Sequence, residues 1–322
     1  MTNKQPIIEF KNVRKEFGEN LAIQDLNLAI KPGELFVLVG TSGSGKTTTL
    51  KMINQLITQT DGDILFNGKK LKEFDKQSLR LDIGYVLQQI ALFPTMTVAQ
   101  NVSVIPDMKK MPKKQTAKIV DSLLSQVGLD PEKYRDRLPS ELSGGEQQRI
   151  GIIRALAAKP PIVLFDEPFS ALDPIVRTQL QDLVLDLHHN MHNTIVFVTH
   201  DMDEALKLGD RIGIMSHGKL LQVDTPDDIA QHPVNEFVEN FFAGTVAKNV
   251  FETPVGKLIK TGYTYRKQTG TNLEPQLTES DTLEMAFQLL SKTAEVSVNR
   301  SDQVVGYLNR QQVIRYLSEV KS

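Results

Sequence analysis

The sequence lacks residues and segments that many classes of protein require. It contains no cysteine in 322 residues, which excludes disulfides, thiolate metal sites and cysteine nucleophiles. No run approaches the ~18 apolar residues that cross a bilayer, and the N-terminal MTNKQPIIEF has no apolar core of the kind found in signal peptides. We therefore expect the chain to remain in the cytosol.

An excess of either charge is also missing. The 37 lysines and arginines nearly balance the 39 aspartates and glutamates, giving a net charge of −2, so the composition gives no reason to expect a nucleic-acid partner. Hydrophobic residues make up 40% of the chain, which is typical of globular proteins. A length of 322 residues allows about two domains.

Short apolar runs alternate with helical patterns over residues 1–245. The runs at 36–39, 162–165 and 195–198 are each followed by a helical pattern. Continuous Val, Ile and Leu runs are typical of strands covered on both faces, so we predict an α/β domain with a parallel sheet. Between two of the strands, at about 90–150, the pattern predicts a helical insertion.

The pattern changes near residue 245. Residues 246–274 predict a linker, because the segment around Lys260 has no sustained period and glycines flank it. Residues 275–322 then predict, in chain order, a strand or turn, a helix, two strands at 295–298 and 304–308, and a second helix. We therefore predict a small second unit of the α+β class.

A glycine-rich segment follows the first apolar run. Residues 40–47, Gly-Thr-Ser-Gly-Ser-Gly-Lys-Thr, fit the pattern G-x-x-x-x-G-K-[ST] between a strand and a helix. Glycines let backbone N–H groups surround a polyphosphate, and the following helix N-terminus favours negative charge. Lys46 would reach the β- and γ-phosphates, and Thr47 would offer its hydroxyl to Mg²⁺. The predicted nucleotide-binding residues of this segment are Gly40, Thr41, Ser42, Gly43, Ser44, Gly45, Lys46, Thr47 and Thr48.

Two acidic residues end the second apolar run. Asp166 and Glu167 directly follow residues 162–165. At the end of a strand, Asp166 could hold Mg²⁺ through its water shell, and Glu167 could orient an attacking water. Together with a glycine-rich phosphate loop, this pair predicts hydrolysis of a nucleoside triphosphate.

Residues 142–148, Leu-Ser-Gly-Gly-Glu-Gln-Gln, resemble the signature motif of ABC-type ATPases. Three further elements of that family match in chain order: Gln88 at the Q-loop, residues 170–173 at the D-loop, and His200 after the third apolar run. The resemblance covers residues 7–243. It implies a P-loop NTPase fold, the ABC cassette, with a RecA-like core, a β-subdomain and a helical subdomain.

This resemblance assigns roles to individual residues and implies ATP and Mg²⁺ as cofactors. The implied catalytic residues are Glu167, His200 and Gln88, and the implied Mg²⁺ ligands are Thr47, Gln88 and Asp166. Phe17 would stack on the adenine of ATP. Core packing is the alternative for Phe17, since a single aromatic residue is a weak signal.

A second copy of the chain is also implied. Ser143, Gly144 and Gly145 precede a helix, so their N–H groups form a second anion-binding end. In the family, this end and Asp173 of the D-loop meet the ATP bound to the partner, which requires a head-to-tail dimer. Hydrolysis of ATP would then open the dimer.

One set of these motifs without a membrane span resembles a separate ATPase subunit of an importer. Such a subunit lies on the cytoplasmic face of a bacterial membrane, where permease chains dock near Gln88 against residues 89–98. An extracytoplasmic solute-binding protein would be an indirect partner. The competing hypotheses are a soluble ABC ATPase of repair or translation and a regulatory subunit that binds ATP without hydrolysis.

Three segments, residues 83–90, 149–157 and 199–207, are similar to the osmoprotectant branch of the family, whose members import glycine betaine, carnitine or choline. Import of a polyamine or an amino acid is the alternative. Residues 275–322 resemble a single repeat of the cystathionine-β-synthase (CBS) type, a regulatory module that normally occurs in pairs. Pairing between two copies of the chain and loss of ligand binding both remain open.

Overall fold

The computed structural model describes residues 5–170, 172–242, 253–264, 276–300 and 303–319. The chain divides into two compact units, Met1–Glu239 and Asn240–Ser322. Within the described ranges, every helix is too short or too polar to span a bilayer.

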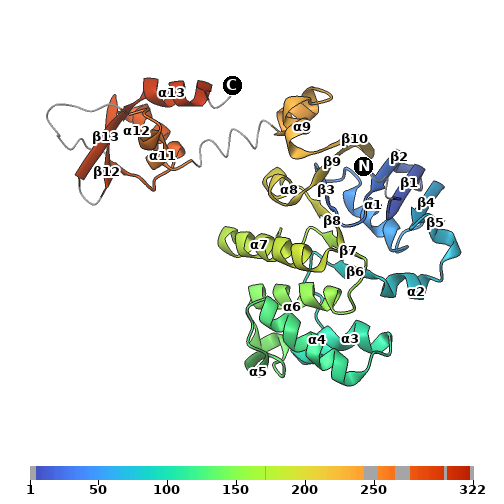
Figure 1. Cartoon of the computed structure of the whole chain (residues 1–322). Helices are drawn as coiled ribbons and strands as arrows, with labels where there is room; N and C mark the ends of the chain where they lie inside the picture. Colours follow the sequence, from blue (N-terminus) through green and yellow to red (C-terminus); the bar gives the residue numbers. More distant parts are fainter. Residues whose placement is uncertain (1–4, 171, 243–252, 265–275, 301–302, 320–322) are drawn as a thin grey trace. The chain divides into compact units, whose positions relative to one another are not determined.

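A six-stranded sheet forms the centre of the first unit (Figure 1). In spatial order its strands are β10 (Lys219–Asp224), β9 (Arg211–Ser216), β3 (Leu35–Gly40), β8 (Thr194–Thr199), β7 (Ile162–Asp166) and β6 (Ile83–Val86). Neighbouring strands are parallel except for the antiparallel pair of β9 and β10. Every residue of β3, β7 and β8 is buried. This confirms the predicted α/β architecture, since continuous apolar strands need cover on both faces.

Helices surround this sheet and fill the segment between β6 and β7. Helices of the first unit include α1 (Lys46–Ile53), α2 (Lys76–Leu81), α3 (Val98–Met108), α4 (Lys113–Gln126), α5 (Pro131–Tyr134), α6 (Gly144–Leu156), α7 (Pro174–Met191), α8 (Met202–Leu208) and α9 (Pro226–Gln231), with 3-10 helices at Leu71–Glu73 and Pro139–Glu141. Helices α3 to α6 group together at one end of the unit (Figure 1). They form the predicted helical insertion.

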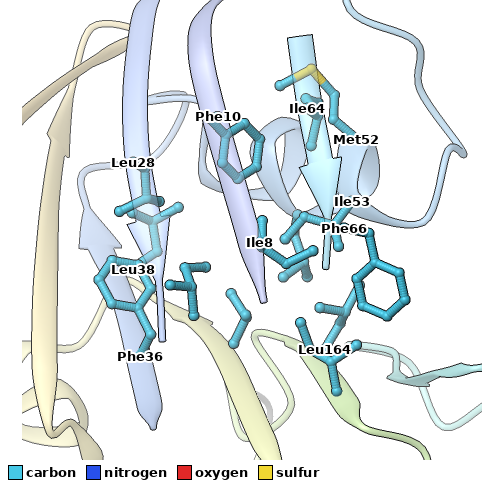
Figure 2. Close-up of a cluster of buried hydrophobic side chains, with 14 of the residues drawn as sticks. Ile8, Phe10, Leu28, Phe36, Leu38, Met52, Ile53, Ile64, Phe66 and Leu164 are labelled. Carbon is cyan, nitrogen blue, oxygen red and sulfur yellow. The ribbon is translucent and has the colours of Figure 1, made fainter. Parts of the chain in front are cut away.

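A second, antiparallel sheet packs beside the first. Its strands, in spatial order, are β2 (Asn20–Ile30), β1 (Ile8–Phe17), β4 (Asp61–Phe66) and β5 (Lys69–Lys70). Figure 2 shows side chains of this sheet, such as Phe10 and Phe66, around Leu164 of the central sheet and Ile53 of α1. This shared apolar core holds the two sheets and α1 together, and α1 is the helix that begins at the glycine-rich loop.

The second unit has its own small core. Its elements are α11 (Val255–Lys260), β11 (Gln276–Thr278), α12 (Leu283–Lys292), β12 (Glu295–Arg300), β13 (Gln303–Asn309) and α13 (Arg310–Glu319). Strand β11 pairs in parallel with β12, and β12 pairs with β13 in antiparallel fashion. The strands and helices therefore follow the order that the sequence predicts for residues 275–322.

The predicted linker over residues 246–274 is wrong for residues 255–260. These residues form α11, whose Val255 and Leu258 are fully buried in the core of the second unit. The pattern missed this helix because a six-residue element offers only one short apolar repeat. Residues 246–252 and 265–274 of the predicted linker lie outside the described residues.

Candidate nucleotide site

Three segments that the sequence selects meet at one edge of the central sheet. The glycine-rich loop follows β3, Glu167 follows β7, and His200 follows β8. These strands are parallel neighbours in the order β3, β8, β7. Their carboxyl ends therefore lie side by side, which is where ligands bind in open α/β sheets.

The glycine-rich loop has the geometry of a phosphate cradle. Gly43 and Gly45 have positive φ angles of 76° and 101°, a region that favours glycine. The buried Lys46 Nζ donates hydrogen bonds to the carbonyl oxygens of Gly40 and Thr41, both at 2.9 Å. Burial lowers the pKa of Lys46, while the nearby carboxylates of Glu167 and Asp166 raise it. The lysine therefore lies folded against its own loop, at the start of helix α1.

A cavity of about 540 Å³ lies against this loop and is of the size that holds small ligands and cofactors. The lining residues are Phe17, Asn20, Leu21, Ala22, Ser42, Gly43, Ser44, Gly45, Lys46, Thr47, Thr48, Glu167, His217 and Gly218. Phe17 is 48% exposed, so it is not part of the core and its ring is available to the cavity. Lys15 Nζ lies 4.6 Å from the centroid of that ring.

Asp166 is buried and has a hydrogen-bond donor on each carboxylate oxygen. Thr47 Oγ1 donates to Asp166 Oδ1 at 2.7 Å, and Tyr85 OH donates to Asp166 Oδ2 at 3.1 Å. Burial and the charge of Asp166 raise the pKa of Tyr85, which keeps the phenol protonated as a donor. Sequence reasoning missed Tyr85, because nothing in the segment around it shows that β6 pairs with β7.

Glu167 and His200 form a pair beside the cavity. Glu167 Oε2 lies 2.9 Å from His200 Nδ1, a hydrogen-bond distance. The backbone of Glu167 has a φ of +45°, which is strained for a residue with a side chain, and strained residues cluster at active sites. The N–H of Glu167 donates to the carbonyl of Val198, which holds this turn against β8.

Gln88 contacts Ser170, which lies in the segment that follows Glu167, and not the Asp166 carboxylate. Its Nε2 donates to Ser170 Oγ at 3.3 Å, and Ser170 Oγ donates to the carbonyl of Glu167 at 3.2 Å. Arg177 holds the next part of this segment, because its guanidinium donates to the carbonyl of Leu172 at 3.2 Å. Arg177 belongs to none of the motifs found in the sequence.

The signature segment lies apart from these residues within one chain. None of the cavity-lining residues in the described part of the chain comes from 143–145. Ser143 caps helix α6: its Oγ accepts from the N–H of Glu146, whose carboxylate accepts from the N–H of Ser143 at 2.7 Å. Hydrogen bonds from Tyr134 and Ser143 lower the pKa of Glu146.

Asp173, predicted to meet ATP across a dimer, caps helix α7 in a single chain. Its Oδ1 accepts from the N–H of Val176 at 3.0 Å. Asp173 and residues 143–145 are thus each found at a helix N-terminus, where anions are favoured.

The polar groups beside the loop fit a magnesium–phosphate ligand. Thr47 and Asp166 offer oxygen donors, which Mg²⁺ prefers, and Mg²⁺ usually takes its remaining ligands from water and phosphate. No cluster of three His, Asp or Glu side chains that could hold a metal ion occurs among the described residues. The buried hydroxyl of Ser44 has no hydrogen-bond partner within the described chain, so the loop has a polar atom left for a ligand.

Comparisons with known proteins identify similar sequences. The family model described as ABC transporter matches residues 23–170. The choline transport ATP-binding protein OpuBA of Bacillus subtilis (strain 168) is 52% identical over 236 residues, which are 73% of this chain and 62% of that protein. The glycine betaine uptake system ATP-binding protein YehX of Escherichia coli (strain K12) is 45% identical over 236 residues, 73% of this chain and 76% of that protein. The chain therefore spans less than two thirds of OpuBA but more than two thirds of YehX.

Solved structures are also similar to this chain. The ATP-binding cassette MJ0796, solved as a dimer in a post-hydrolysis state bound to ADP and Pi, is 35% identical with a TM-score of 0.60. That similarity covers 68% of this chain and 98% of MJ0796. The protein cbiO1 of Clostridium perfringens is part of the ABC transporter complex cbiONQ and is 26% identical to this chain, with a TM-score of 0.67. That similarity covers 77% of this chain and 96% of the cbiO1 chain.

Proposed function

Because the chain belongs to the ABC transporter family of ATP-binding proteins, we propose that it is the ATPase subunit of an importer. In this proposal ATP hydrolysis drives uptake of an osmoprotectant quaternary amine, such as glycine betaine, carnitine or choline. The observation that carries the enzymatic part is that one cavity is lined by both the glycine-rich loop and Glu167, whose carboxylate lies 2.9 Å from His200. The cargo rests on relatives named for choline and glycine betaine transport.

Binding of ATP would use the loop and the aromatic wall of the cavity. The N–H groups of residues 42–48 would surround the phosphates, and Lys46 would exchange its two carbonyl partners for phosphate oxygens. Phe17 would stack on the adenine, since its exposed ring lines the same cavity. Thr47, Asp166 and Gln88 would hold Mg²⁺, which when bound neutralises charge that develops on the phosphates.

Hydrolysis would depend on Glu167 and His200. Glu167 would orient the attacking water and accept its proton as the water oxygen bonds to the γ-phosphorus, while the bond from that phosphorus to the β–γ bridging oxygen breaks and ADP leaves. His200 would bind the γ-phosphate and keep the Glu167 carboxylate in place through the contact already present between Nδ1 and Oε2. Both residues follow neighbouring strands, so the sheet itself fixes their separation.

A second copy would complete each site. The N–H groups at Gly144 and Gly145, and that of Ser143 after it leaves the Glu146 carboxylate, would bind the γ-phosphate of ATP held by the other chain. Asp173 would lie at the same interface. Two such half-sites fit a two-fold dimer. The dimeric MJ0796 structure bound to ADP and Pi supports this arrangement for a similar cassette.

Permease chains would dock beside Gln88. The nearby side chains of Leu87 and Phe93 are exposed apolar groups, and such surfaces mark interaction sites. This docking would place the protein at the cytoplasmic face of a bacterial membrane, with a solute-binding protein as an indirect partner. For residues 275–322 we propose a regulatory role as a single CBS-like motif.

The Glu167→Gln variant tests the proposed activity. We expect phosphate release to fall by at least about a hundredfold, the usual scale for loss of a catalytic base, while ATP binding persists. Size-exclusion chromatography with light scattering should show ATP-dependent dimers that accumulate in the variant and dissociate in the wild type as ATP is consumed. Glu236→Gln, which removes an exposed carboxylate outside the cavity, is the matched control.

Two results would contradict the proposal. Undiminished phosphate release by Glu167→Gln would remove this residue from its role, and a chain that never dimerises with ATP would remove the shared site. For the cargo, the complex reconstituted with its permease should take up labelled glycine betaine or choline in preference to a polyamine.

A further inference from the structure

The hydroxyl of Tyr85 donates a hydrogen bond to one carboxylate oxygen of Asp166, and the other oxygen accepts from Thr47 of the glycine-rich loop. Asp166 Oδ2 accepts from Tyr85 OH at 3.1 Å, and Asp166 Oδ1 accepts from Thr47 Oγ1 at 2.7 Å. Asp166 is only 6% exposed, so water is a poor substitute for either donor. Rotation of the carboxylate would break both hydrogen bonds, and each donor therefore opposes it.

The position of the Tyr85 hydroxyl is itself fixed by packing. Strand β6 pairs in parallel with β7, with Tyr85 opposite Leu164, and the Tyr85 ring packs against the core cluster that contains Leu164. The neighbouring Gly84 leaves no room for movement toward α6, because a Cβ there would lie 2.6 Å from the carbonyl oxygen of Ala155. The strand and the core thus hold the phenol in one place.

We propose that Tyr85 is a positioning residue for the metal that accompanies ATP. Its hydroxyl keeps the Asp166 carboxylate turned so that Oδ1 points toward the Thr47 hydroxyl, where the metal and the phosphates would be bound. This inference rests on the proposed function, because it concerns the same ATP site. It adds a residue that contacts neither nucleotide nor metal and acts only through Asp166.

The Tyr85→Phe variant removes the hydroxyl and keeps the ring that packs in the core. The affinity for ATP is measured by titration calorimetry, once with excess Mg²⁺ and once in EDTA. The ratio of the two dissociation constants is the magnesium gain. We expect the magnesium gain to fall by about tenfold, the scale of one hydrogen bond to an ionised acceptor, with affinity in EDTA unchanged. Unchanged affinity in EDTA also shows that the cavity remains folded.

Two controls separate positioning from a general loss of structure. Tyr134→Phe removes another tyrosine hydroxyl that donates to a carboxylate, that of Glu146 at 2.6 Å, and should leave the magnesium gain as in the wild type. In an Asp166→Asn background, Tyr85→Phe should have no further effect, because the carboxylate through which it acts is gone.

The outcomes are distinct. A magnesium gain in Tyr85→Phe equal to that of the wild type overturns the role of Tyr85. The role is also overturned if Tyr85→Phe lowers the magnesium gain by the same factor in the Asp166→Asn background, or if Tyr134→Phe lowers it by the same factor as Tyr85→Phe does. A loss confined to Tyr85→Phe and absent from the Asp166→Asn background supports it. A wild-type chain that binds no ATP, or shows no magnesium gain, overturns the proposed function and this inference with it.

Discussion

Alanine substitutions at Gly43 and Gly45 test whether the glycine-rich loop is shaped by backbone strain alone or by close packing as well. Both glycines have positive φ angles, 76° and 101°. Their surroundings differ, because a Cβ at Gly43 would have no atom within 4 Å, whereas a Cβ at Gly45 would lie 2.5 Å from Ile23 Cδ1 and 2.9 Å from the carbonyl oxygen of Ala22. The two substitutions are therefore matched in chemistry and differ in packing.

The difference sets the expected size of each effect. Positive φ costs a residue with a Cβ about 1–2 kcal/mol, which is the whole penalty expected for Gly43→Ala. Gly45→Ala should lose a further ~1–3 kcal/mol, the usual cost of overpacking, since a backbone carbonyl in β2 cannot move aside as a flexible side chain can. The free energy of unfolding of the first unit should therefore fall more for Gly45→Ala than for Gly43→Ala.

Urea unfolding followed by far-ultraviolet circular dichroism measures both free energies, and this signal suits a chain that has no tryptophan. ATP binding by each variant gives a second measurement, because the N–H of Lys46 directly follows Gly45. We expect weaker binding in Gly45→Ala. Equal losses of stability in the two variants, or a larger loss in Gly43→Ala, would refute the packing argument.

Two further predictions concern Phe17, which lines the cavity, and Glu204, a buried carboxyl in helix α8. Phe17→Leu should weaken ATP binding by about fivefold through loss of aromatic stacking, with little change in the free energy of unfolding because Phe17 is exposed. Phe17→Tyr keeps the ring and should bind ATP as the wild type does. Unaltered ATP binding by Phe17→Leu would exclude stacking. Burial raises the pKa of the Glu204 carboxyl, although Thr199 and Gln181 donate hydrogen bonds to it. The unfolded chain, in which the pKa is about 4.3, therefore loses this proton at a lower pH than the native protein does. The free energy of unfolding should fall as the pH rises from the pKa of the unfolded state through the raised pKa of the native state. Glu204→Gln should flatten that decline in thermal unfolding between pH 4 and pH 8, and parallel profiles would contradict it.

Three of the six strands of the central sheet, β3, β7 and β8, are predictable from the sequence because they are continuous apolar runs. Strands β3, β7 and β8 are buried along their whole length, so each shows a pattern that solvated strands lack. The helical pattern that follows residues 162–165 corresponds to α7, which begins with Asp173 as its cap and Pro174 at its first position. Helix α11 was not, because its six residues are too few to show a period.

Contacts between neighbouring strands lay beyond the sequence pattern. Tyr85 and Asp166 are 81 positions apart, and they meet only because β6 is placed next to β7 in the sheet. Local patterns predict the fully buried strands such as β7, but they give neither the short strand β6 nor the spatial order of the strands. The glycine-rich loop is predictable for the opposite reason, since residues 40–47 contain in one continuous segment the glycines, the lysine and the hydroxyl of the phosphate-binding pattern.

The signature segment shows why the second copy belongs in the proposal. Two glycines form the start of α6, although a cap is already supplied by Ser143 and Glu146. What glycines add is close access to backbone N–H groups, and a Cβ at Gly144 would meet no atom within 4 Å. The described residues that line the nucleotide cavity of the same chain include none from 143–145. This accessible helix end would therefore bind the phosphate of ATP held by a second chain, since it does not reach the cavity of its own chain.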